Sequence, residues 1–185
     1  MKDIFSVMAS SYKYIGIFIM IAIFSCKDPM IELKKPDNYW GECKAFVNEE
    51  EWIACPYAKL KVEDDIKVLS IKGIVFNESF LIRESISIIN VPLELGTYQL
   101  DDWRSEERPF ILFVYKDHDV ALADYLVQEG VEAKGTVSLT EYDEILQEIK
   151  GTFECTLYLY QNPGKPDAPD SLVITDGYFH TRIVD

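Results

Sequence analysis

Histidine is scarce in this chain, and the common catalytic motifs are missing. The 185 residues include two histidines, and the sequence has no H-E-x-x-H, no G-x-S-x-G, no glycine-rich phosphate loop and no cysteine pair at zinc-site spacing. His118 falls in a polar turn at residues 116–119, where we expect a solvated side chain. His180 alternates with Phe179, so we expect it to face solvent or cap a sheet. These absences predict a protein without catalytic residues, cofactor or bound metal.

Basic residues are also few relative to acidic ones. The chain carries 18 lysines and arginines against 32 aspartates and glutamates, for a formal net charge of −14. A chain this acidic is repelled by nucleic acid and by anionic lipid surfaces. We therefore expect no nucleic-acid partner, and we interpret the acidity as a source of solubility.

No apolar run is long enough to cross a membrane. The longest covers residues 15–24, whereas a spanning helix needs about 20 apolar residues. The run fits the core of a secretory signal, with Lys2 and Lys13 ahead of it. It ends at residues 23–26 (IFSC), which resemble a bacterial lipobox with Cys26 as the residue that receives the lipid. The alternatives are a plain secretory signal cut elsewhere and a buried apolar helix, and translation could begin at Met1 or at Met8.

The lipobox interpretation divides the chain into three parts. We predict a signal peptide at residues 1–25, a lipidated tether at 26–40 and one β-domain at 41–185. The tether is proline-containing and lacks sustained periodicity. This places the protein in the bacterial cell envelope, held by a lipid such as palmitate on Cys26. We expect the outer membrane, facing the periplasm or the cell surface.

Beyond the tether, short β-branched and aromatic runs alternate with turn residues, which is typical of an all-β protein. The strongest signal lies in residues 135–160, where apolar and polar residues alternate on both sides of a connection at 143–148. We predict an antiparallel, largely meandering β-sandwich or flattened barrel. Further strands are predicted at residues 42–47, 52–56, 58–62, 66–76, 84–91, 96–100, 110–115, 120–127 and 172–184.

Three stretches depart from simple alternation. Gly73 interrupts the pattern of residues 66–76 and predicts a bulge. Residues 175–177 (TDG) predict a kink or bulge in the last strand. Residues 120–132 have apolar residues at helical spacing as well, but Gly130 and the flanking turns favour a strand.

Three cysteines follow Cys26. Cys155 shares a face with Phe153 and Leu157, so we predict a buried, unreactive thiol. Cys43 and Cys55 remain, and in an oxidising compartment we predict that they form a disulfide. A three-residue loop at 48–50 would set the two cysteines opposite each other, whereas a two-residue loop at 48–49 would turn the sulfurs to opposite faces. Glu49, where a tight turn prefers glycine, favours the longer loop.

Two loops offer candidate sites. Residues 101–108 (DDWRSEER) surround Trp103 with acidic and basic residues, and could bind a hard cation, present an aromatic ring to a sugar, or form a plain solvated loop. Trp40 and Trp52 are expected to pack in the core or at the domain edge. Ser171 lies in Asp-Ser-Leu beside a proline-rich loop, a pattern that resembles the O-glycosylation motif of Bacteroidota envelope proteins.

Several short segments, taken in order, resemble one protein family. They are Val47-Asn48 with Trp52, residues 96–100 (GTYQL), 135–143 (GTVSLTEYD), 149–153 (IKGTF) and 174–179 (ITDGYF). Together, behind a lipobox, they are similar to uncharacterised Bacteroidota lipoproteins built on a domain of unknown function. The resemblance implies a lipid-anchored β-domain in the envelope and carries no catalytic residues across. The chain departs from it at Glu49, where the family often has glycine, and at Cys155, where it often has an aromatic residue.

The sequence predicts a non-enzymatic binding or structural module, attached to the membrane through Cys26, with a protein or glycan partner that it does not identify. A lipocalin-like carrier with a barrel cavity is the first alternative. An envelope hydrolase that uses paired carboxylates is the second.

Overall fold

The computed structural model describes residues 39–63, 65–104, 107–128 and 135–184, and within them every regular element is a β-strand. The all-β fold is therefore confirmed. The ten strands are β1 (Glu42–Val47), β2 (Glu50–Glu63), β3 (Ile66–Phe76), β4 (Ile82–Pro92), β5 (Gly96–Gln99), β6 (Phe110–Asp117), β7 (Val120–Leu126), β8 (Gly135–Asp143), β9 (Glu148–Gln161) and β10 (Ser171–Val184).

Hydrogen bonding links the strands into one sheet that closes on itself. Neighbours run β2-β3-β4-β6-β7-β9-β10, and β10 returns to β2 through a short parallel pairing of Ile183 with Ala58. β1 pairs with both β10 and β2, while β8 and then β5 extend from β9. All other pairings are antiparallel and most join consecutive strands, as expected for a meander closed into a flattened barrel.

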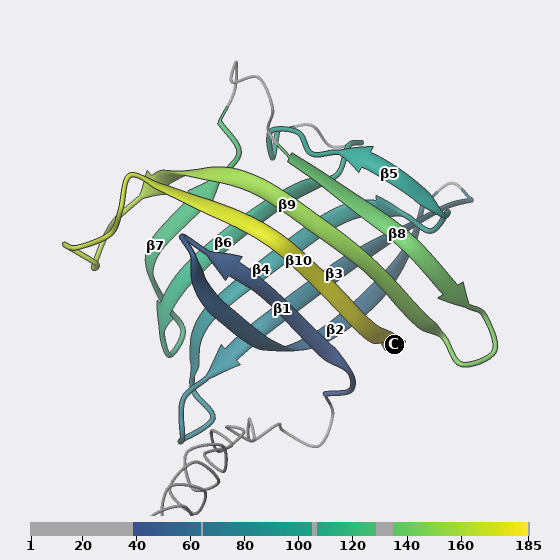
Figure 1. Ribbon diagram of the computed structural model, residues 1–185, viewed down its shortest axis with the longest axis horizontal. Helices are drawn as coiled ribbons and strands as arrows, with labels where there is room; N and C mark the ends of the chain where they lie inside the picture. The colour runs from purple at the N-terminus through teal and green to yellow at the C-terminus, as the bar shows by residue number, and fades with distance from the viewer. Residues whose placement is uncertain (1–38, 64, 105–106, 129–134, 185) are drawn as a thin grey trace, which may run out of the picture. The chain divides into compact units, whose positions relative to one another are not determined.

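The closed sheet is flattened into two layers. Figure 1 shows β1, β10, β9, β8 and β5 in front of β2, β3, β4, β6 and β7, with the strands of the two layers crossing at a steep angle. Layers of this kind enclose a core between their inner faces, filled by alternate residues of every strand. In β1 the burial alternates strictly between exposed and buried residues.

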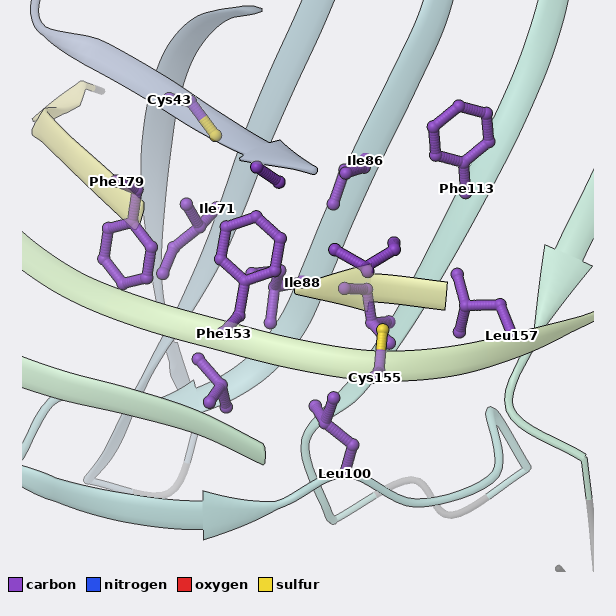
Figure 2. Packing of buried hydrophobic residues seen from close by; sticks show 14 of the residues in the cluster. Cys43, Ile71, Ile86, Ile88, Leu100, Phe113, Phe153, Cys155, Leu157 and Phe179 are labelled. Carbon is purple, nitrogen blue, oxygen red and sulfur yellow. The ribbon is translucent and has the colours of Figure 1, made fainter. Parts of the chain in front are cut away.

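The interior is filled by side chains from both layers. Figure 2 shows Phe153 and Cys155 of β9 among Ile71 and Ile88 of the opposite layer. Phe113 is fully buried and meets the Tyr125 ring edge-on, with centroids 6.2 Å apart. Close-packed large side chains of this kind leave a core rather than a lumen.

β2 is one long strand where we predicted two. Pro56 interrupts the β-pattern in the sequence, yet it lies inside β2 opposite Gly73 of β3. On its other edge, β2 pairs with β1 as far as Ala54 and with β10 from Ala58. Pro56 falls between these two ladders. On that edge of β2, the missing N–H of the proline therefore removes no ladder hydrogen bond.

The hairpin between β1 and β2 turns in two residues, so the predicted three-residue loop is wrong. Val47 pairs with Glu50, and Asn48 and Glu49 both have positive φ, at 49° and 70°. Asparagine tolerates that conformation, and Asn48 is also pinned to β10: its Oδ1 accepts from Val173 N at 2.8 Å and its N–H donates to Val173 O at 2.9 Å. These long-range bonds hold the tight turn despite Glu49.

The tight turn also contradicts the predicted disulfide. Cys43 pairs with Ala54, and no disulfide joins Cys43 to Cys55. Cys43 lies in the interior cluster, whereas Cys55 points to the outer face together with Tyr57. The ring of Tyr39 packs edge-on against Tyr57 on that face, at 5.8 Å. A one-residue change of register was enough to separate the sulfurs.

The predicted bulge at Gly73 is wrong as well, since Gly73 stays in register with Pro56 and with Ile86. Its lack of a side chain serves packing instead. A Cβ on Gly73 would lie 2.7 Å from Cη2 of Trp52 and 3.0 Å from Sγ of Cys43. The glycine makes room for the inward-facing indole.

Two other local predictions are confirmed. The register of β10 shifts between Ile174 and Gly177, where Asp176 has a φ of 51°, so residues 175–177 do form a bulge. Residues 120–126 form strand β7 rather than a helix, paired with β6 and β9.

Candidate ligand-binding groove

A groove of about 440 Å³ opens on the outer surface between three segments: residues 102–104, 126–128 and 158–160. It lies where the edge of β9 changes partner. The β7 ladder ends with Leu126 opposite Tyr158, and the β8 ladder begins with Gly135 opposite Cys155. The two strands diverge along this edge, and the loop that follows β5 lies beside the gap. Its volume falls within the roughly 300–1,000 Å³ of typical small-ligand sites.

The loop presents Trp103 from a braced turn. The Asp102 carboxylate accepts the Arg104 N–H at 3.0 Å, and it also receives a two-point fork from the Arg104 side chain, at 2.8 and 2.9 Å. Asp102 is buried while Trp103 and Arg104 are exposed. An aspartate that bonds the backbone two residues ahead fixes the turn between them. Trp103 therefore lies inside a hydrogen-bonded turn, between Asp102 and Arg104.

The turn is anchored to the rest of the domain on both sides. Leu100 is buried in the core, and its N–H donates to Gly135 O at 3.0 Å. Asp101 N donates to Pro109 O at 2.8 Å, and the Asp101 carboxylate accepts from Arg108 at 2.9 Å. Backbone and side-chain bonds thus fix the loop at the start and at the end.

Two aromatic rings meet across the groove. Trp103 and Tyr160 have ring centroids 6.4 Å apart at an interplanar angle of 65°. They remain 44% and 55% exposed, respectively. Aromatic pairs favour this edge-to-face arrangement, because the positive edge of one ring meets the negative face of the other. The contact sets the orientation of both rings and leaves ring surface open to the groove.

The sequence identified one side of this site and missed the other. The loop around Trp103 was a candidate, but the segments at 126–128 and 158–160 were not. A signal was present: Tyr158 and Tyr160 fall on the face of β9 that otherwise carries polar residues. Sequence could not join them to Trp103, because the loop between β5 and β6 reaches β9 only through strand pairings between distant segments, β5 with β8, β8 with β9, and β6 with β7.

The two histidines do not line the groove. Across the described ranges, no group of three or more histidine, cysteine or acidic side chains could hold a metal ion. His118 is exposed in the turn after β6. His180, on the outer face of β10, packs against the Trp40 ring at 4.8 Å and lies 3.3 Å from the Glu148 carboxylate. Arg182 also stacks on Trp40, at 4.2 Å, so these residues secure the start of the domain.

Burial lowers the reactivity of two of the cysteines, Cys43 and Cys155. Burial raises the pKa of Cys43 to about 12 and raises the pKa of Cys155 still further. Thiols of raised pKa are poor nucleophiles at neutral pH. The predicted burial of Cys155 is confirmed, at 6% exposed.

The remaining predicted sites are not tested by the structure. Cys26 and the predicted signal lie outside the described residues. Ser171 is the first residue of β10, half-buried and opposite Tyr158. Its glycosylation stays a prediction. Within the ranges that the structure describes, no helix has the length and apolarity to cross a membrane.

The fold and the groove together define a class: an all-β domain with a filled interior and an aromatic groove on its outer surface. Comparison with protein-family models, with curated proteins and with solved structures finds no match to this chain. The resemblance to Bacteroidota lipoproteins therefore stays a prediction.

Proposed function

We propose that this protein is a lipid-anchored, non-enzymatic binding module of the bacterial cell envelope, and that its ligand occupies the groove beside Trp103. The observation that carries the proposal is the pair of half-exposed rings, Trp103 and Tyr160, held by a turn that Asp102 braces. Exposed aromatic groups on rigid supports bind ligands at a low entropic cost, because little freedom remains to be lost.

The anchor is supported by the N-terminal sequence. The apolar run at residues 15–24 is too short to span a membrane and stops at Ser25-Cys26. Lipidation of Cys26 would keep the domain at the membrane surface. The resemblance to envelope lipoproteins points in the same direction.

The carrier alternative is less well supported than surface binding. A carrier needs an internal cavity, but the interior of this barrel contains fully buried large side chains, including Phe113, Tyr125 and Phe179. The hydrolase alternative needs two carboxylates that face one bond. In the groove loop, Asp101 and Asp102 are instead engaged by Arg108 and Arg104.

The groove function is tested by a thermal-shift and calorimetry panel on the full chain. The ligands are neutral hexasaccharides, hexagalacturonate, a proline-rich peptide and a long-chain fatty acid. The matched variant is Trp103→Ala/Tyr160→Ala, whose native fold is checked by circular dichroism. We expect at least one ligand class to bind the parent protein saturably and to lose affinity for the double variant. Absence of binding by all four classes, or equal binding to both proteins, would overturn the function.

The anchor is tested separately. Mass spectrometry of the detergent-extracted protein should find a diacylglyceryl group on Cys26 at the mature N-terminus. A Cys26→Ala variant should leave the membrane fraction. An unmodified Cys26 in mature protein that still fractionates with membranes would refute the lipid anchor and leave the groove function standing.

A further inference from the structure

The Trp103–Tyr160 pair has a geometry suited to a saturated, chair-shaped ring. The two rings stand 65° apart rather than stacked, so a ligand ring can lie against the face of one while touching the edge of the other. The face of an aromatic ring carries partial negative charge and attracts the weakly positive C–H groups of a sugar ring. A pyranose offers such C–H groups on its faces and hydroxyl groups around its rim.

Polar side chains lie beside the aromatic pair, where a sugar rim would need them. Arg104 follows Trp103 directly, and its guanidinium plane is fixed by the fork to Asp102, at 2.8 and 2.9 Å. Gln128 is exposed just beyond the end of β7, on another wall of the groove. Amide and guanidinium groups are planar and offer more than one hydrogen-bonding position, which suits hydroxyls on adjacent carbons. The half-buried Tyr158 adds a phenolic hydroxyl to the third wall.

The charge distribution selects a neutral ligand. Both arginines of the loop already face carboxylates, Arg104 with Asp102 and Arg108 with Asp101. An anionic ligand would therefore have to compete with an internal ion pair, within a chain of net charge −14. Asp102, the acidic side chain among the lining residues, is buried and held by the Arg104 fork, so it offers little to a cationic ligand. Neutral ligands meet neither obstacle.

We propose that the groove binds a neutral oligosaccharide, with Trp103 and Tyr160 as the stacking surface and with Arg104 and Gln128 as partners for its hydroxyl groups. This inference rests on the proposed binding function and narrows its ligand to one chemical class. A linear chain of neutral pyranoses fits an open groove better than it fits a deep pocket, because the chain can extend past either end of the groove.

The test is isothermal titration calorimetry of the full chain with cellohexaose, maltohexaose, xylohexaose and mannohexaose as neutral probes. Hexagalacturonate serves as the anionic probe. We expect at least one neutral hexasaccharide to bind with a Kd below about 5 mM. Trp103→Ala and Tyr160→Ala should each weaken binding about tenfold or more, as for a central aromatic contact. Trp103→Phe, which keeps a ring, should retain most of the affinity.

Trp40→Ala is the matched control. Trp40 is exposed to a similar degree, at 37%, but it stacks on Arg182 and does not line the groove. Sugar binding should be unchanged in this variant. Saturation-transfer NMR on the parent protein should place the sugar C–H groups against aromatic protons, and Trp103→Ala should remove the transfer.

The outcomes separate this inference from the function on which it rests. Groove-dependent binding of a peptide or a fatty acid, with no binding of neutral hexasaccharides, would overturn the saccharide inference and keep the binding function. Tighter binding of hexagalacturonate than of every neutral probe would overturn the inference that the ligand is neutral. Sugar binding that survives both aromatic substitutions would overturn the placement of the site.

Discussion

The interior of the barrel and the outer groove each contain an edge-to-face pair of aromatic rings, but the two pairs differ in burial. Phe113 and Tyr125 meet edge-on inside, with centroids 6.2 Å apart, and both are fully buried. Trp103 and Tyr160 meet at 6.4 Å outside, and about half of each side chain stays exposed. The ring geometry is similar, so the difference lies in what covers the remaining ring surface.

That difference assigns the two pairs to different roles. Burial of a large aromatic side chain stabilises the fold by removing apolar area from water, on the order of 1.5–3 kcal/mol relative to exposure. A half-exposed pair obtains little of this gain and keeps its faces for a ligand. Substitutions inside should therefore cost stability, and substitutions in the groove should cost binding.

The largest effect is expected for Phe113→Ala. Phe113 contacts the rings of Trp52, Tyr115 and Tyr125, so its removal leaves a cavity that several rings line. We expect a loss of about 3–5 kcal/mol in the free energy of unfolding, measured by urea denaturation. Leu112→Ala, the half-buried neighbour on the other face of β6, should cost about 1 kcal/mol. Equal losses would show that the inner face of β6 contributes no more to the free energy of unfolding than its outer face.

A smaller loss is expected for Gly73→Ala. The added methyl would lie 2.7 Å from the Trp52 ring, which is itself buried, so the indole must move. Overpacking of this kind costs about 1–3 kcal/mol. At Gly96 the nearest atom would be 3.4 Å away, so Gly96→Ala should change stability by less than about 0.5 kcal/mol. A tolerated Gly73→Ala would contradict the tight packing of the interior beneath Trp52.

Glu84 tests the interior in another way, since it is an acid on the inward face. Burial raises the pKa of its carboxyl and nearby Glu50 raises it further, while a 2.9 Å bond from Trp52 Nε1 and nearby Lys165 lower it. The folded protein therefore holds this proton more tightly than the unfolded chain. Its stability should fall as the pH rises from the ordinary value of 4.5 through the raised pKa.

Glu84→Gln removes this titration and keeps an oxygen to accept from Trp52. We expect the variant to gain stability relative to the parent protein at pH 7 and to match it more closely near pH 4, in denaturation series across pH. Glu51→Gln removes one negative charge at an exposed site on the same sheet and serves as the control for net charge. A parent-like decline with pH in Glu84→Gln would assign the decline to other groups.

The smallest effect on stability is expected in the groove. Trp103→Ala and Tyr160→Ala should each change the free energy of unfolding by less than about 0.5 kcal/mol, because the removed side chains are half exposed and leave no internal cavity. Urea denaturation checks this on the same proteins that are used for binding. A loss above 2 kcal/mol for either variant would show that the Trp103–Tyr160 pair stabilises the fold. It would contradict the assignment of different roles to the exposed and the buried pair.

Most of the strands could be predicted from local patterns. Residues 42–47 and 66–76 were predicted with the bounds that the structure has, because alternation with period two reports which face is buried. The fold class followed from many such segments separated by turns. The predicted burial of Cys155 was confirmed for the same reason, since its neighbours in register are apolar.

The register between strands and the groove came only from the tertiary structure. The two-residue turn at Asn48 depends on hydrogen bonds to Val173, far along the chain, and a shift of one residue there sends Cys43 and Cys55 to opposite faces. Position 73 requires a glycine because the Trp52 ring lies over it, and no local sequence pattern reveals this contact. The groove brings Trp103, in the loop between β5 and β6, to Tyr160 of β9, because β5 reaches β9 through β8 and β6 reaches it through β7. Alternation tells which side of a strand is buried, but the partner of that strand depends on contacts between distant segments.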